Sequence, residues 1–141
     1  MATEIVRKSS QKGRLFSTDD TNRTATFVIT TGALDRDNES VNPRGGSFDE
    51  FRSNPVLAWN HETDEFPLGI VEEFWNDEVD IDGKATDALL ARVKFSKANP
   101  KAVLAWEMLS EKMLRACSIS FLPIGQASKN SAGGNHYDRW K

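Results

Sequence analysis

The chain has 141 residues, 38% of them hydrophobic and 28% charged, which suits a single domain with one core and a well-solvated surface. Its formal net charge of −3 at pH 7 argues against a broad basic face, and so against binding of nucleic acid through phosphate neutralisation. The single cysteine, Cys117, excludes an internal disulfide and is typical of a reducing compartment. We expect neither a signal peptide, because the first residues have no apolar core, nor a membrane span, because no run approaches roughly 20 apolar residues.

The first part of the chain is polar and leads into a strand. Residues 1–22 are predicted to form a polar N-terminal arm or a first strand. Residues 24–31 (TATFVITT) are β-branched and aromatic, which favours a strand. Residues 35–46 are rich in turn formers and predict a loop. Residues 47–50 (Ser-Phe-Asp-Glu) match a capping box and predict a short helix that continues through Phe51.

Three strands are predicted in the middle of the chain. Residues 56–61 (VLAWNH) read as a buried strand whose odd-numbered residues, His61 among them, share one face. Residues 70–75 and 88–95 predict two further strands. The dipeptide at residues 82–83, Asp-Gly, lies between them and is a turn signal.

The clearest helix signal begins at Asn99. Asparagine is a favourable N-cap, and Pro100 suits the first helical position. Apolar residues recur at helical spacing and are predicted to form its packing face: Val103, Trp106, Leu109 and Met113.

Residues 117–124 predict another strand, which carries a serine of chemical interest. Alternation sorts its side chains into two faces, Cys117, Ile119 and Phe121 on one and Ser118, Ser120 and Leu122 on the other. Residues 127–141 are rich in Ser, Asn and Gly and are predicted to form a flexible tail that leads to a missing or truncated strand.

These elements predict a mixed α+β fold, mainly an antiparallel β-barrel flanked by helices. The expected organisation is an arm or first strand over residues 1–22, a barrel domain over residues 23–126 and a tail over residues 127–141.

A succession of short motifs resembles the prohead (capsid maturation) proteases of tailed bacteriophages, which are distant relatives of the herpesvirus assemblins. The motifs, in order, are Thr30-Thr31-Gly32-Ala33, Asp35-Arg36-Asp37, Val41-Asn42-Pro43, Asn60-His61, Pro67-Leu68-Gly69 and Cys117-Ser118-Ile119-Ser120-Phe121-Leu122-Pro123. The resemblance extends over most of the chain. It implies an assemblin-like β-barrel wrapped by helices, a serine endopeptidase site, and a homodimer.

The resemblance assigns roles to two residues. The histidine of the family's Asn-His element falls on His61, and its nucleophile falls on Ser118, the first residue of a Ser-Ile-Gly-Phe-like element. The chain has Ser120 where glycine is common in the family. Family members continue into a Leu-x-Glu-like element whose acidic residue completes the triad, and the chain reaches Lys141 before such an element. We therefore expect a truncated chain or a cleaved product with reduced or no activity.

Other residues compete for these roles. Ser120 shares the predicted face of Ser118 and is the alternative nucleophile. Cys117 points to the opposite face and is interpreted as a small buried core residue. His136 fits the His-Ser-His order of the assemblins as a third member of the site, and Asp138 is a weaker candidate. The acidic residues just after His61 lack a second histidine at ligand spacing, so no metal or other cofactor is predicted.

Three hypotheses follow from these residues. The first is a capsid-maturation serine endopeptidase that cleaves the internal scaffold, and itself, inside the assembling procapsid in the host bacterial cytoplasm. Its expected partners are the scaffold protein and the major capsid protein, with neither nucleic acid nor membrane. The second is a non-enzymatic module that binds capsid or scaffold protein through the same fold, and the third is a cysteine hydrolase that uses Cys117.

Overall fold

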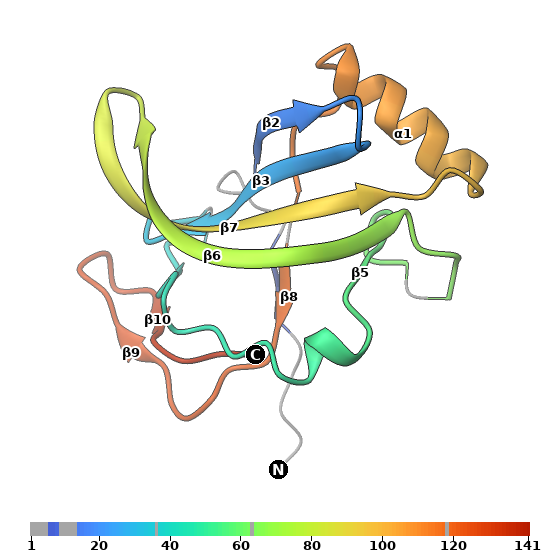
Figure 1. Ribbon diagram of the computed structural model, residues 1–141. Helices are drawn as coiled ribbons and strands as arrows, with labels where there is room; N and C mark the ends of the chain where they lie inside the picture. The colour runs from blue at the N-terminus through green and yellow to red at the C-terminus, as the bar shows by residue number, and fades with distance from the viewer. Residues whose placement is uncertain (1–5, 9–13, 36, 63, 118) are drawn as a thin grey trace.

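The computed structural model describes residues 6–8, 14–35, 37–62, 64–117 and 119–141. Its largest part is a curled, antiparallel five-stranded sheet in the order β2-β3-β7-β6-β5 (Figure 1). The strands are β2 (Arg14–Asp19), β3 (Thr24–Thr31), β5 (Val56–Leu57), β6 (Gly69–Ile81) and β7 (Lys84–Phe95). The helix α1 (Pro100–Ser110) lies against one end of this sheet.

Two smaller sheets complete the β structure. β1 (Val6–Lys8) pairs antiparallel with β8 (Ile119–Phe121). β4 (Ser40–Val41), β10 (Asn135–Tyr137) and β9 (Ser128–Lys129) form a three-stranded sheet in which β10 runs parallel to β4. The described part of the chain is thus mainly antiparallel β, as predicted. It has one α-helix where two helices were expected, and the second is a single 3₁₀ turn, η1 (Phe51–Ser53).

The β6–β7 hairpin is the longest pairing in the molecule. Its register extends from Ile81 opposite Lys84 to Gly69 opposite Phe95. Asp82 and Gly83 form the connecting turn with positive φ angles of 53° and 81°, values that suit the primed turns of two-residue hairpins. The predicted turn is therefore confirmed, and both strands extend further toward it than the sequence indicated.

Three clusters of buried side chains surround the sheet. The largest lies between α1 and one face of the sheet and contains Phe27, Phe95, Trp106 and Leu109. The second contains Val28, Val79, Ala88 and Leu90. The third joins the sheet to the smaller strands, and its members are Val41, Leu89, Phe121 and Trp140.

The start of α1 agrees with the prediction, whereas its packing face differs. The Asn99 side chain accepts a hydrogen bond from the Lys101 backbone N–H at 3.1 Å, as an N-cap does. The buried residues are Ala102, Ala105, Trp106 and Leu109. Met113 is 72% exposed because α1 ends at Ser110 and the chain turns away before it.

The predicted capping box at Ser47 is wrong. The Ser47 backbone N–H donates to the Trp140 carbonyl at 2.8 Å, so this residue pairs with the C-terminal segment instead of starting a helix. The short η1 begins four residues later and has no side-chain cap. The backbone pairing of Ser47 with the distant Trp140 therefore determines the local structure, in place of the helix start that the capping-box residues indicated.

Residues 127–141, predicted to form a flexible tail, have regular pairing in the structure. β10 lies between β4 and β9, and the Leu122 and Lys141 backbones exchange two hydrogen bonds of 2.7 and 3.0 Å. Trp140 is only 3% exposed, and its indole N–H donates to the Asn42 carbonyl at 2.8 Å. A Cβ at Gly45 would overlap the Asp138 carbonyl, so glycine is needed where this segment crosses the loop before η1.

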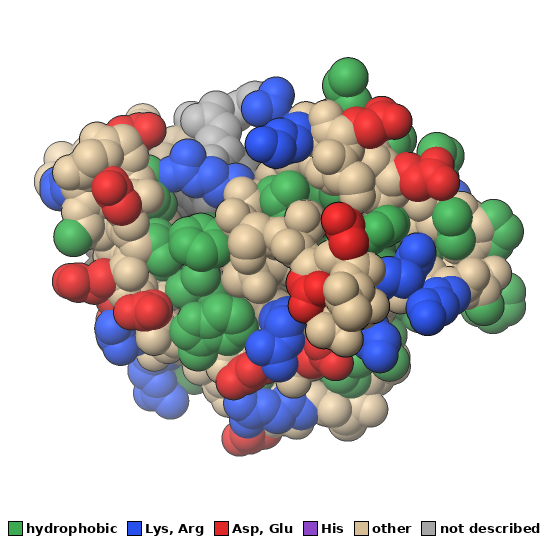
Figure 2. Space-filling view, turned by 45° about the horizontal axis from the view of Figure 1, so that its top comes forward, with side chains coloured by type: hydrophobic (Ala, Val, Ile, Leu, Met, Phe, Trp, Pro, Cys, Tyr) green, Lys and Arg blue, Asp and Glu red, His purple; other side chains and the backbone are tan. Residues whose placement is uncertain are grey.

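The exposed surface carries both signs of charge. Figure 2 shows acidic and basic side chains interspersed with apolar ones on the face in view. Arg44 pairs with Asp87 at 2.6 Å, and Arg92 pairs with Glu73 at 3.0 Å. Within the described ranges, no helix has the length and apolar character needed to cross a membrane.

We expect Trp140→Ala to lower the free energy of unfolding by about 3–5 kcal/mol, the usual cost of removing a large buried aromatic side chain. Urea unfolding followed by circular dichroism measures this change. Phe66→Ala is the control, since Phe66 is 86% exposed and its loss should cost within about 0.5 kcal/mol of zero. Equal costs for the two variants would contradict the placement of Trp140 in the core.

Candidate functional site

His61 lies in a turn and not in the predicted strand. β5 ends at Leu57, and the chain then turns so that the Glu62 N–H donates to the Trp59 carbonyl at 2.9 Å. Asn60 and His61 both have left-handed backbones, with φ of 50° and 58°. Such angles are uncommon outside glycine, although Asn and His tolerate them better than most residues. The prediction of a strand through His61 is therefore wrong.

Two consecutive left-handed residues are a conformation that costs free energy, and such strain is concentrated at functional sites. Contacts on both sides hold this turn. The Leu68 N–H donates to the Leu57 carbonyl at 2.8 Å, and Glu62 lies 3.9 Å from the Lys101 ammonium group on α1. These contacts link the turn to the edge of the sheet through a backbone hydrogen bond and to the helix through a solvent-exposed ion pair.

Ser120 is in the middle of β8. Its neighbour Phe121 is 1% exposed in the third apolar cluster, so strand alternation directs Ser120 to the opposite side, where it is exposed. β8 forms a two-stranded antiparallel sheet with β1, in which Ser120 is opposite Arg7. A buried neighbour and a paired strand thus set the direction of the Ser120 hydroxyl.

The turn and β8 bring a histidine and a serine into contact. Ser120 Oγ and His61 Nδ1 are 2.8 Å apart, although the residues are 59 positions apart in the sequence. Ser118, the nucleophile predicted from the resemblance, lies outside the described residues. The structure therefore places one predicted site residue, His61, beside Ser120, which the sequence offered as the alternative nucleophile.

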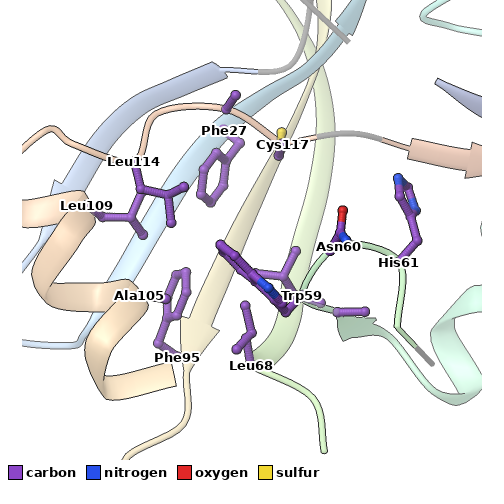
Figure 3. Close-up of a pocket in the computed structure, with 13 residues that line it drawn as sticks. Phe27, Trp59, Asn60, His61, Leu68, Phe95, Ala105, Leu109, Leu114 and Cys117 are labelled. Atoms are coloured by element: carbon purple, nitrogen blue, oxygen red, sulfur yellow. The ribbon is translucent and has the colours of Figure 1, made fainter. Parts of the chain in front are cut away.

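A cavity of about 330 Å³ adjoins His61. In Figure 3, the Trp59 ring lies between the apolar side chains at α1 and the Asn60–His61 turn, with the His61 imidazole at the edge of the group. Cys117 also lines the cavity. This cavity was not predicted from the sequence. A signal for it in the sequence was Ala105, a small buried residue of α1 that lines the cavity.

Cys117 is a poor candidate nucleophile. Burial raises the pKa of its thiol to about 12, and Sγ lies 3.9 Å from the Val28 carbonyl oxygen. The thiolate is the reactive form of cysteine, and it is scarce at neutral pH with so high a pKa. Cys117 packs against the cluster beneath α1, in agreement with its interpretation as a core residue.

The two candidates for a third site residue have contacts in the smaller sheet. His136 Nδ1 is 2.8 Å from Ser40 Oγ, and these residues are opposite one another in the parallel β10–β4 pair. Asp138 Oδ1 accepts a hydrogen bond from the Asn42 side-chain amide at 3.0 Å. Both contacts link residues 136–138 to residues 40–42. His136 and Asp138 therefore have a structural role in holding these two segments together.

One acidic cluster lies away from His61. Carboxylate oxygens of Asp35, Asp37 and Glu39 lie within 4.8 Å of one another. Asp35 Oδ1 accepts hydrogen bonds from the backbones of Asp37 and Glu39 at 2.9 and 3.0 Å, and the Tyr137 hydroxyl donates to Glu39 at 3.2 Å. These bonds shape a turn next to β4, and exposed acidic groups of this kind are common without an ion.

Comparison of the chain with protein-family models, with curated proteins and with solved structures finds no match.

We expect Cys117 to react slowly with iodoacetamide in the native protein at pH 8. A pKa of about 12 in place of 9.0 reduces the thiolate fraction at this pH by a factor of about a thousand. Mass spectrometry of samples quenched over time, with and without urea, measures the two rates. Equal rates in the two conditions would show that the thiol is accessible and ionised, and would return Cys117 to the candidates for nucleophile.

Proposed function

We propose that this protein is a serine endopeptidase of the phage prohead type, with an assemblin-like fold, that cleaves the internal scaffold during capsid maturation. The observation that carries the proposal is the 2.8 Å contact between Ser120 Oγ and His61 Nδ1. It joins the two motifs, Asn60-His61 and the serine-containing strand, on which the resemblance to these proteases assigns a base and a nucleophile. The curled antiparallel sheet is compatible with such a fold.

In this proposal the two ring nitrogens of His61 have different tasks. A neutral imidazole carries one N–H donor and one acceptor nitrogen. If Nδ1–H donates to Ser120 Oγ, the acceptor is Nε2, which is the nitrogen that takes the nucleophile's proton in serine proteases. Ser120 then acts as a positioning residue that selects this tautomer. Ser118, on the same predicted strand face, is the nucleophile.

The reaction then follows the usual course of acyl transfer. Ser118 Oγ attacks the scissile carbonyl while His61 Nε2 accepts its proton. His61 returns this proton to the departing amine, and an acyl-enzyme remains. Water then attacks the acyl-enzyme ester while His61 accepts a proton from it. His61 gives this proton to Ser118 Oγ as the carboxylic acid product leaves, which restores the serine hydroxyl. The proposed partners are the scaffold protein and the major capsid protein, and the proposed state is a homodimer inside the procapsid.

The alternative is a non-enzymatic module that binds scaffold or capsid protein through the same fold. In this case the Ser120–His61 contact would be a surface hydrogen bond that holds the turn to β8. Co-purification with scaffold, together with intact scaffold in every variant of His61 and the two serines, would favour this alternative.

In a protein that carries the complete site, we expect Ser118→Ala and His61→Ala to reduce scaffold cleavage at least about a thousandfold. Without the nucleophile or its base, only transition-state binding by the rest of the site remains. Gel analysis of the procapsid scaffold protein co-expressed with each variant measures the loss. Ser128→Ala is the matched control, because Ser128 is an exposed strand serine in β9. Undiminished cleavage by Ser118→Ala would overturn the assignment of the nucleophile.

We expect Ser120→Ala to have a smaller effect, about tenfold on kcat/KM, and to change the pH dependence of kcat/KM. Ser120→Thr keeps the hydroxyl and should restore both the rate and the pH profile. If Ser120→Ala abolishes cleavage while Ser118→Ala retains it, Ser120 is the nucleophile and not a positioning residue.

A further inference from the structure

The cavity beside the Ser120–His61 pair is an opening into the main core. Its walls come from three parts of the fold. Ala105 and Leu109 belong to α1, Phe27 and Phe95 to the sheet, and Trp59 to the turn that carries His61. Figure 3 shows these side chains gathered around one space, with the turn along one side of it. His61 is one of the residues that line the space, so the cavity adjoins the proposed catalytic base.

The geometry of the neighbouring backbone keeps this space unfilled. Protein interiors are normally packed as densely as organic crystals, so an unfilled apolar space in a core has a local cause. Ala58, Ala105 and Ala116 are among the residues that line it, and each of them has only a methyl side chain. The left-handed Asn60 and His61 turn the chain away, and Trp59 remains 39% exposed instead of burying its ring fully.

The lining selects an apolar occupant. None of the described residues that line the cavity is Lys, Arg, Asp or Glu, and its polar side chains are limited to Asn60, His61 and Cys117. A charged or amide group placed among Phe27, Leu109 and the other apolar walls would lose its hydration without gaining a partner. Its volume of about 330 Å³ is at the lower end of ligand pockets, which suits one side chain better than an extended ligand.

We propose that this cavity binds one aliphatic or aromatic side chain of the polypeptide substrate, next to the scissile bond, and so sets the cleavage preference of the enzyme. The proposal rests on the proposed protease function, because the cavity is next to His61, the proposed base. The polar residues at its His61 side are where the substrate backbone would lie, and the apolar walls at α1 are where the side chain would lie. The preferred substrate segment therefore carries Leu, Met or Phe at this position, and neither an acidic nor an amide residue.

The test is a binding experiment that does not depend on catalysis. The probes are N-acetyl-L-leucinamide and N-acetyl-L-asparaginamide, which have side chains of similar shape and opposite polarity. Each is titrated into ¹⁵N-labelled full-length chain and followed by amide chemical shifts. We expect the leucine probe to bind in the millimolar range, as is usual for so small a ligand, and at least about tenfold more tightly than the asparagine probe. The largest shifts should be at Trp59, Cys117 and the α1 residues that line the cavity.

Filling the cavity should abolish this preference. Ala116→Phe adds a ring at an exposed position that lines the cavity, and we expect it to weaken leucine-probe binding at least about tenfold. Ala85→Phe is the matched control, since Ala85 is an exposed strand alanine next to the far turn of the β6–β7 hairpin. If Ala116→Phe does not fold, Ala58→Phe fills the same space from the turn. Equal affinity for the two probes, or shifts located elsewhere, would overturn the proposal.

Probe binding and scaffold cleavage, measured on the same variants, distinguish the role of the cavity from the protease function. Selective leucine binding without scaffold cleavage would support the apolar site and count against the protease. Scaffold cleavage by a protein that binds neither probe selectively, and by Ala116→Phe at the wild-type rate, would support the protease and overturn the role of the cavity.

Discussion

Burial of β7 on both faces is the constraint on which the rest of the fold depends. Val93 and Phe95 contribute to the cluster beneath α1, and Leu90 and Leu89 contribute to the other two clusters. A strand in this position must have neighbours on both edges and cover on both sides. β3 and β6 supply the edges through long antiparallel registers. α1, β8 and Trp140 cover the face that carries Leu89, Val93 and Phe95. On the opposite face, Leu90 packs in the second cluster with Val28 and Val79.

The candidate site depends indirectly on the burial of β7. The long strands carry neither His61 nor Ser120. They fix the short elements that do, because β5 is paired to the end of β6 and β8 is anchored by Phe121 in the cluster that contains Leu89. The regular sheet therefore provides the frame, and the irregular turn at residues 59–62 provides His61 and the opening beside it. This division of roles is common, since functional residues are often on loops positioned by a rigid scaffold.

Local signals predicted the parts of the fold that local interactions determine. The β-branched run at Thr24–Thr31 became β3, Asp82 and Gly83 formed the hairpin turn, and Asn99 capped α1. The predictions at Ser47 and at residues 127–141 missed pairings between segments about 96 positions apart, for which a single sequence carries no periodic signal. At His61, the apolar run that begins at residue 56 suggested a buried strand, but it could not reveal a backbone with two positive φ angles. Alternation in the strand after residue 117 placed Ser118 and Ser120 on one face, so alternation alone did not distinguish these two serines as candidate nucleophiles.

The strands next to the candidate site are short, and this affects how the site responds to heating. β5 has two residues and β8 has three, whereas β6 and β7 have 13 and 12. Segments with few hydrogen bonds open at lower free energy than the core does. On heating, Ser120 and His61 should therefore separate in partial openings that leave the long hairpin and its far-ultraviolet signal intact. The site is accordingly less heat-resistant than the fold that carries it.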